Sequence, residues 1–329
     1  MSAIHYISDN NNFGVYSLME HTSNKTSIRQ GIWALADPKI SITSLASMTI
    51  GVSVAALEGP ISWLWFIVLG LAMFCMEVAK NAWGDIYDYD SGTDLAVSAL
   101  DRTKFSGGKR VLVDALLTRK QTWWVAFIFG IAGLLLGAVI VFIQEPMVFW
   151  LGLAGLLLGW SYHGPPLQLV YRGLGELAVL IIYGPVIAVS TYMIQRHQMS
   201  MDVLWLSLPL GILITAFLWV NEFPDHDADK SASKRNLIVI LGKQTASRCL
   251  PFIYLTAFML VIMMPWITNI QAQIWGALIA LPAAFLASKW VWESPVDFYR
   301  DKPVQPMALL SFVLYSVGVA LSLLVFGNA

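Results

Sequence analysis

The chain has 329 residues, 57% of them hydrophobic and 12% charged, and a formal net charge of −1. Charged residues are about half as frequent as in an average soluble domain, and the mean hydropathy is +0.65. This composition excludes an ordinary soluble globular protein and indicates an integral membrane protein surrounded by the lipid bilayer. A net charge near zero gives no sign of a nucleic-acid partner, and none is expected.

The first 30 residues are polar and include the run Asp9-Asn10-Asn11-Asn12. They lack the apolar core of a cleavable signal peptide. We therefore expect residues 1–35 to form a flexible cytoplasmic tail and residues 36–329 to form one transmembrane domain.

Apolar runs long enough to cross a bilayer predict an all-α membrane protein with about nine transmembrane helices. In chain order, these runs span residues 40–57, 61–84, 122–143, 146–163, 174–194, 203–224, 249–268, 272–290 and 306–326. The longest connection, about 85–121, is too short to be a second domain. Because it begins in acidic residues and continues into basic ones, we expect it to be functional.

Lysines and arginines are distributed unevenly between the two sides of these helices. All but one of the 20 fall in the N-terminal segment, or in and beside the connections after the second, fourth, sixth and eighth helices; the exception is Arg196. Basic residues favour the cytoplasmic side of a membrane. The pattern predicts a cytoplasmic N-terminus, cytoplasmic active-site loops and a C-terminus on the opposite side.

An acidic cluster ends the second apolar run. Its acidic residues are Asp85, Asp88, Asp90 and Asp94. The spacing of Glu77, Asn81, Asp85 and Asp88 places them on one face of a helix. A solvated helix end is the simpler explanation for one such cluster on its own.

A second acidic cluster ends the sixth run, where Asn221, Asp225 and Asp229 recur at helical spacing. Carboxylates this close repel one another unless a cation compensates them. Mg²⁺ prefers a few carboxylates together with phosphate oxygens over a cage made only of protein ligands. Two facing clusters therefore suggest two half-sites that hold Mg²⁺ and a diphosphate between them.

Basic and aromatic residues near the clusters fit the same hypothesis. Lys109-Arg110 and Lys234-Arg235 are candidate ligands for phosphate oxygens, although cytoplasmic loops are rich in such residues in any case. The candidate aromatic residues are Trp83, Tyr87 and Tyr89. Their ring faces could stabilise an allylic carbocation, or they could belong to the ordinary aromatic belt at a membrane surface.

These motifs resemble those of the UbiA superfamily of intramembrane prenyltransferases, over roughly residues 40–326. The first family motif is Asn-Asp-x-x-Asp with a later Gly-x-Asp, and Asp85-Ile-Tyr-Asp88 followed by Gly92-Thr-Asp94 is similar to it. The second resembles Asp225-x-x-x-Asp229-Lys followed by Lys234-Arg-Asn-Leu. Tyr162-His-Gly-Pro-Pro-Leu and the later Arg172-Gly-Leu-Gly-Glu are similar to the menaquinone-type branch.

The resemblance implies a bundle of nine helices around a central cavity, a prenyl diphosphate bridged by Mg²⁺, and a small aromatic acceptor. The metal ligands, or residues that support them, would be Asp85, Asp88, Asp94, Asp225 and Asp229, which would also be the catalytic carboxylates, Asp94 excepted. The substrate-binding residues would be Asn81, Tyr87, Lys109, Arg110, Tyr162, Arg172, Asn221 and Lys234.

Gly84 departs from the family pattern, because it stands where the family usually has the first Asn. Members of the superfamily that cyclise a prenyl diphosphate vary this motif, so a terpene cyclase is the alternative to a transferase acting on a quinone precursor. A cation-coupled transporter is a third hypothesis. Transporters carry ionisable groups near the middle of the bilayer, whereas Glu77 and Lys80 lie toward one end of their helix.

Overall fold

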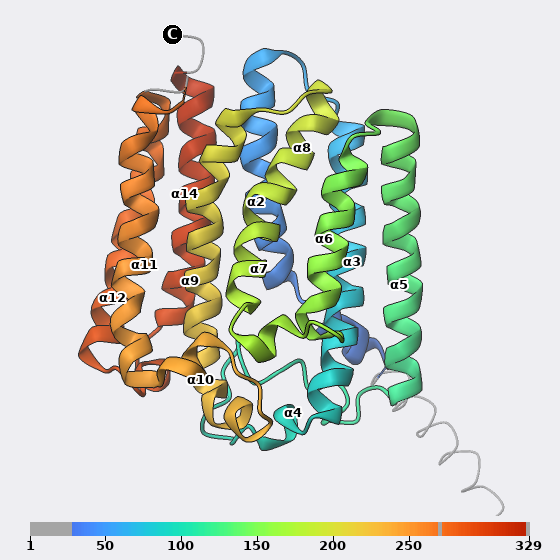
Figure 1. The fold of residues 1–329 in the computed structure, drawn as a ribbon, viewed down its shortest axis with the longest axis vertical. Helices are drawn as coiled ribbons and strands as arrows, with labels where there is room; N and C mark the ends of the chain where they lie inside the picture. Colours follow the sequence, from blue (N-terminus) through green and yellow to red (C-terminus); the bar gives the residue numbers. More distant parts are fainter. Residues whose placement is uncertain (1–27, 269–271, 327–329) are drawn as a thin grey trace, which may run out of the picture.

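The computed structural model describes residues 28–268 and 272–326, and these two stretches contain helices and no strand (Figure 1). The predicted all-α class is therefore confirmed. Eight helical spans are long and apolar enough to cross a bilayer. They are α2 (Pro38–Glu58), α3 (Trp63–Asp90), α5 with η1 (Arg119–Val139 and Ile140–Gln144), α7 with η3 and α8 (Gly175–Ile181, Ile182–Val186 and Ile187–Arg196), α9 (Met201–Ser231), α11 with η4 (Lys243–Met263 and Met264–Trp266), η5 with α12 (Ala272–Ala280 and Leu281–Glu293), and α14 (Val304–Phe326). The ninth apolar helix, α6 (Val148–His163), is shorter.

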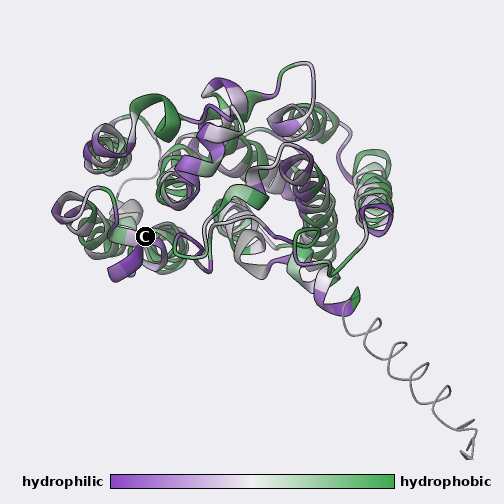
Figure 2. Ribbon diagram, turned by 90° about the horizontal axis from the view of Figure 1, so that it is seen from below, coloured by the Kyte–Doolittle hydropathy of each residue, from purple (hydrophilic) through white to green (hydrophobic). Residues whose placement is uncertain are grey.

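Short helices cap one end of this bundle. They are α4 (Thr93–Ala96), η2 (Leu169–Arg172), α10 (Leu237–Leu241) and α13 (Phe298–Asp301). Figure 1 shows α4 and α10 at the same end, while α14 finishes at the opposite end. Seen from the α4 and α10 end, hydrophilic residues gather on the near connections and hydrophobic ones along the helices behind them (Figure 2).

Two helices extend further than the sequence predicts, and both carry an acidic cluster. The second predicted helix was bounded at residue 84, but α3 continues to Asp90 and ends where Gly92 takes a left-handed conformation, φ +82°. The sixth was bounded at residue 224, but α9 continues through the buried Pro224 to Ser231. Proline removes only one backbone hydrogen bond, so the packed helix continues past it. The connection expected from residue 85 therefore starts only at Ser91.

The core is centred on α9, because 72% of its most apolar stretch is buried, against 17% for α5 at the edge of the bundle. Buried polar side chains tie neighbouring helices to it. The Trp219 indole donates to the carbonyl of Ala246 on α11 at 3.0 Å, and the Tyr315 hydroxyl of α14 donates to the carbonyl of Leu206 at 2.8 Å. The helices on which α9 packs therefore hold it rigidly.

The chain before α2 is partly helical. Of the tail expected over residues 1–35, residues 1–27 lie outside the described part, whereas residues 28–36 are helical. Leu35 is buried and packs with Val78 and Ala82 of α3, and the Asn81 side-chain amide donates to the carbonyl of Leu35 at 2.8 Å. This short segment is thus fastened to the helix that bears the first acidic cluster.

Close backbone contact between Gly276 of η5 and Gly318 of α14 generates a prediction about stability. A β-carbon at residue 318 would overlap the carbonyl oxygen of Gly276, so Gly318→Val should destabilise the fold by about 1–3 kcal/mol through overpacking. Gly137→Val on α5 is the matched control, because nothing lies within 4 Å of its β-carbon position. Thermal unfolding in detergent measures both, and equal midpoints would contradict the prediction.

Candidate active site

The two acidic clusters meet across the side chain of Lys234, which follows α9. Its Nζ lies 3.2 Å from Oδ1 of Asp88 on α3 and 3.5 Å from Oδ1 of Asp229 on α9. All three side chains are largely buried. The structure therefore brings together residues almost 150 positions apart, as the sequence predicted, and one ammonium group joins them.

Neighbouring charges shift the pKa values of two groups of the site that lie outside the membrane-spanning helices, Lys234 and Asp94. Burial lowers the pKa of Lys234, but attraction by Asp229 and Asp88 outweighs it and raises the pKa well above its usual value. Burial and repulsion by Asp88 and Asp85 raise the pKa of Asp94 to about 8. Lys234 therefore stays protonated near neutral pH, whereas Asp94, with a pKa of about 8, keeps its proton there.

The loop that follows α4 folds back over the carboxylates. The two carboxylate oxygens of Asp85 accept hydrogen bonds from the backbone N–H groups of Val111 at 3.1 Å and Leu112 at 3.0 Å. Residue 108 must be glycine here, since its φ is +73° and a β-carbon would overlap the carboxylate of Asp94. The backbone N–H of Gly107 lies close to the Asp225 carboxylate. The loop Gly107–Leu112 thus contacts both clusters, and Asp85 acts as its anchor.

The predicted basic ligands have partners within the protein. Lys109 pairs with the buried Asp37. The Arg110 guanidinium donates to the carbonyl of Asp94 and to the Asp114 carboxylate, both at 2.9 Å. Arg172 is exposed and donates to the carbonyl of Pro166 at 3.2 Å. Of the predicted basic ligands, Lys234 is thus the one that bridges the two acidic clusters. The phosphate-binding roles of Lys109, Arg110, Arg172 and Arg235 stay predictions.

Several oxygens of the site are buried and accept no hydrogen bond. They are Oδ2 of Asp94, Oδ1 of Asn221, Oδ1 of Asp225, Oε2 of Glu176 and Oε2 of Glu222. Within the described residues, no three His, Cys, Asp or Glu side chains are arranged to hold a metal by themselves. The unpartnered carboxylate oxygens suit Mg²⁺, which takes a few carboxylates and completes its shell with other oxygen ligands. These oxygen donors therefore fit the chemistry of this metal.

The predicted tyrosines lie beside the acidic residues on α3. The ring of Tyr87 stacks on that of His163 at 6.4 Å between centroids, and Tyr162 meets the same imidazole edge-on at 4.8 Å. Lys80 lies 5.4 Å from the centroid of the Tyr162 ring. These contacts place both tyrosines next to the acidic end of α3.

An aromatic group adjoins this end of α3. The Trp83 ring lies 4.2 Å from that of Trp160, 5.0 Å from Trp123 and 5.1 Å from Tyr87, between centroids. It joins α3, α5 and α6. Packed rings of this kind exclude water and offer electron-rich faces to a cation.

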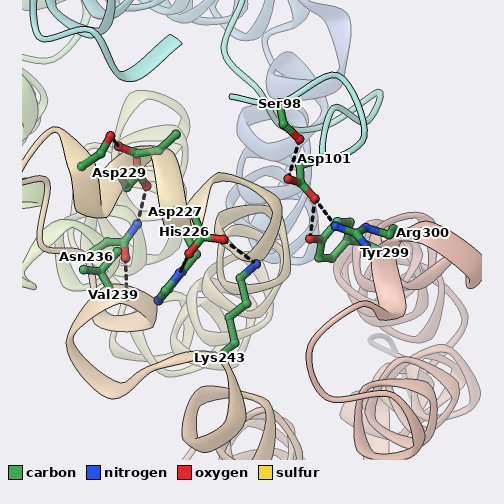
Figure 3. A network of polar contacts seen from close by, with 12 residues as sticks. Ser98, Asp101, His226, Asp227, Asp229, Asn236, Val239, Lys243, Tyr299 and Arg300 are labelled. Carbon is green, nitrogen blue, oxygen red and sulfur yellow. Dashed lines mark hydrogen bonds and ion pairs between the residues drawn. The ribbon is translucent and has the colours of Figure 1, made fainter. Parts of the chain in front are cut away.

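Figure 3 shows how the surrounding loops are fastened. The Asn236 amide donates to Oδ2 of Asp229 at 2.7 Å while its oxygen caps α10. Asp101, in the loop after α4, accepts hydrogen bonds from Tyr299 at 2.9 Å and Arg300 at 2.7 Å, on α13. Burial raises the pKa of Asp101, but hydrogen bonds from Arg300, Ser98 and Tyr299 outweigh it and hold the pKa at about 2. Both halves of the chain therefore hold the loops over the site.

Three residues of the site escaped the sequence analysis as functional candidates. His163 and Asn236 lie inside the motifs that carried the family resemblance, so their positions were a usable signal. Asp37 is far from either cluster in sequence and gave no signal. Asn81, a predicted substrate ligand, uses its amide group to hold Leu35, and its role toward substrate stays a prediction.

Comparisons with known proteins identify the family of the chain. The chain is 25% identical over 254 residues to a 1,4-dihydroxy-2-naphthoate octaprenyltransferase of Bacillus subtilis, covering 72% of this chain and 74% of the relative. It is 29% identical over 223 residues to a 2-carboxy-1,4-naphthoquinone phytyltransferase of Synechocystis, covering 67% and 69%.

Solved structures share the fold. An apo UbiA homolog from Aeropyrum pernix K1 superposes with a TM-score of 0.66 at 17% identity, covering 85% of this chain and 97% of that one. A homolog from Archaeoglobus fulgidus, described as bound to DMAPP and Mg²⁺, superposes with a TM-score of 0.64 at 15% identity, covering 88% and 98%. The sequence profile of the UbiA prenyltransferase family matches residues 44–313. The chain belongs to the UbiA prenyltransferase family.

Proposed function

We propose that this prenyltransferase uses Mg²⁺ to ionise a prenyl diphosphate and transfers the prenyl group to a hydroxylated aromatic acceptor of the naphthoate type. The observation that carries the proposal is the pair of acidic clusters joined through Lys234, with unpartnered oxygens on both sides. The names of the matched relatives, which include naphthoate and naphthoquinone prenyltransferases, support the acceptor class. The A. fulgidus homolog bound to DMAPP and Mg²⁺ supports the donor and the metal.

Four carboxylates and one ammonium group would bind the metal and the diphosphate. Asp88 and Asp94 from one cluster, and Asp225 and Asp229 from the other, would hold Mg²⁺ and the diphosphate. Bound Mg²⁺ would stabilise the negative charge that develops on the departing diphosphate, and Lys234 would contact the same oxygens. For Asp85 we propose a supporting role, because its oxygens hold the loop at Val111 and Leu112.

The transfer breaks a C–O bond and a C–H bond and forms a C–C bond and an O–H bond. The bond between C1 of the prenyl group and the diphosphate oxygen breaks, and its electron pair leaves with the diphosphate. A ring carbon of the acceptor then forms a bond to the allylic cation, and the proton of that ring carbon passes to the released diphosphate or to water. The rings of Trp83 and Tyr87 would shield that cation from water.

The distribution of lysines and arginines also supports one orientation of the protein in the membrane. Basic residues of the described connections gather at the α4 and α10 end, whereas Arg196 lies at the other end of the bundle. By the preference of basic residues for the cytoplasm, we propose that the active-site end and the N-terminus are cytoplasmic and the C-terminus is on the opposite side.

Product analysis tests the proposed reaction. Purified protein with geranylgeranyl diphosphate and Mg²⁺ should consume the substrate only after 1,4-dihydroxy-2-naphthoate is added, and EDTA should stop the reaction. Asp88→Ala and Asp225→Ala should each lower turnover by at least about 100-fold, because each removes a charge-stabilising ligand. A cyclic hydrocarbon formed without acceptor would make the protein a terpene cyclase instead, and near-normal turnover by either variant would contradict the shared site.

The close approach of Gly108 to the Asp94 carboxylate generates another prediction. Gly108→Ala should displace the Asp94 carboxylate and weaken binding of geranylgeranyl thiolodiphosphate with Mg²⁺ by about 10-fold or more. Gly242→Ala is the matched control: its φ is also positive, +76°, but nothing lies within 4 Å of its β-carbon position. Isothermal titration calorimetry measures both affinities, and an equal loss in the two variants would mean that backbone strain alone is responsible.

The raised pKa of Asp94, about 8, predicts a pH dependence of metal binding. Asp94 must lose its proton to bind a cation, so the apparent Mg²⁺ affinity should rise with pH between about 6.5 and 8.5 and then level off. The measurement is calorimetric titration of MgCl2 across this range with the same analogue present. Asp94→Asn should flatten the rise, and an unchanged rise in that variant would assign it to another group.

A further inference from the structure

Gly84 lies on α3 directly before Asp85 and faces the end of α6. A β-carbon at residue 84 would lie 3.2 Å from Cε1 and 3.5 Å from Nδ1 of His163. The first of these contacts is tighter than ordinary van der Waals packing. A side chain at residue 84 would therefore displace the imidazole of His163 by a few tenths of an ångström.

His163, the last residue of α6, is held in that space from several sides. Only 7% of the residue is exposed. Tyr87 stacks on one face of its ring at 6.4 Å, and Tyr162 meets it edge-on at 4.8 Å. Packing against Gly84 and the two tyrosines thus sets the position of the imidazole.

The same imidazole lies against one oxygen of Asp88. His163 Nε2 is 3.7 Å from Asp88 Oδ2, while Lys234 Nζ is 3.2 Å from Asp88 Oδ1. The two oxygens of this carboxylate therefore face two different nitrogen groups. At 3.7 Å the imidazole is beyond direct hydrogen-bonding distance, so it limits the rotation of the carboxylate and leaves Oδ2 with lone pairs for a ligand.

We propose that His163 is a positioning residue that sets the orientation of Asp88 toward the diphosphate site, and that Gly84 is required because it makes room for the imidazole. The inference rests on the proposed function, in which Asp88 binds the metal diphosphate. It gives Gly84, the departure from the family motif, a partner on another helix. Residues that orient a metal ligand typically contribute about 10- to 100-fold to metal affinity.

A double-mutant cycle tests the pairing of the two residues. The readouts are the dissociation constant of geranylgeranyl thiolodiphosphate with Mg²⁺, by calorimetry, and the separate kcat and KM for geranylgeranyl diphosphate. His163→Ala and Gly84→Ala should each weaken binding of the analogue by about 10-fold. The double variant should be no weaker than His163→Ala, because the added methyl group no longer meets a ring.

Two further variants separate positioning from folding. His163→Gln keeps a side chain that can reach the Asp88 carboxylate and should recover most of the affinity that His163→Ala loses; no recovery in a correctly folded His163→Gln variant would contradict the positioning role. Gly159→Ala, one turn earlier on α6 with nothing within 4 Å of its β-carbon position, should bind the analogue like the wild type. Thermal unfolding of each variant identifies any loss of fold.

The outcomes distinguish this inference from the function on which it rests. If Asp88→Ala binds the analogue normally, the proposed site itself is wrong. If Asp88→Ala loses binding while His163→Ala keeps it, or if the two single effects add in the double variant, the positioning role of His163 is overturned and the proposed function stands.

Discussion

The ammonium group of Lys234, placed between Asp88 and Asp229, is the contact on which the arrangement of this end of the protein depends. Without a cation, the two acidic helix ends would repel each other, and the repulsion would be strong in a buried site with a low dielectric constant. Lys234 places one positive charge between a carboxylate of α3 and a carboxylate of α9. The remaining carboxylate oxygens keep a capacity for positive charge that a metal diphosphate can fill.

The fold positions the carboxylates of both acidic clusters by extending two helices beyond their apolar segments. α3 runs on to Asp90 and α9 to Ser231, so the carboxylates stand on regular helix and not on loose connections. Sites on rigid elements hold their geometry more closely than sites on loops. The loop Gly107–Leu112 then packs over them, because Asp85 provides acceptors for its backbone N–H groups.

Much of this could be predicted from the sequence, because helical spacing and apolar runs depend on local order. The membrane-embedded helices, the two acidic faces and the involvement of Lys234 all follow from such patterns. The role of Asp85 could not be predicted, since its partners are backbone groups of a loop whose path no pattern specifies. The partner of Lys109 is Asp37, 72 positions away, and such pairings appear only once the chain is folded.

The hydrogen bonds between Asp101 and α13 have a consequence for how substrate reaches the site. They tie the loop over the carboxylates to the C-terminal half of the chain, through Tyr299 and Arg300. A ligand that arrived from the aqueous side would have to break this charged contact before the loop could lift. The fastening therefore adds the free energy of two hydrogen bonds to an anionic carboxylate to the cost of opening this loop toward the aqueous side.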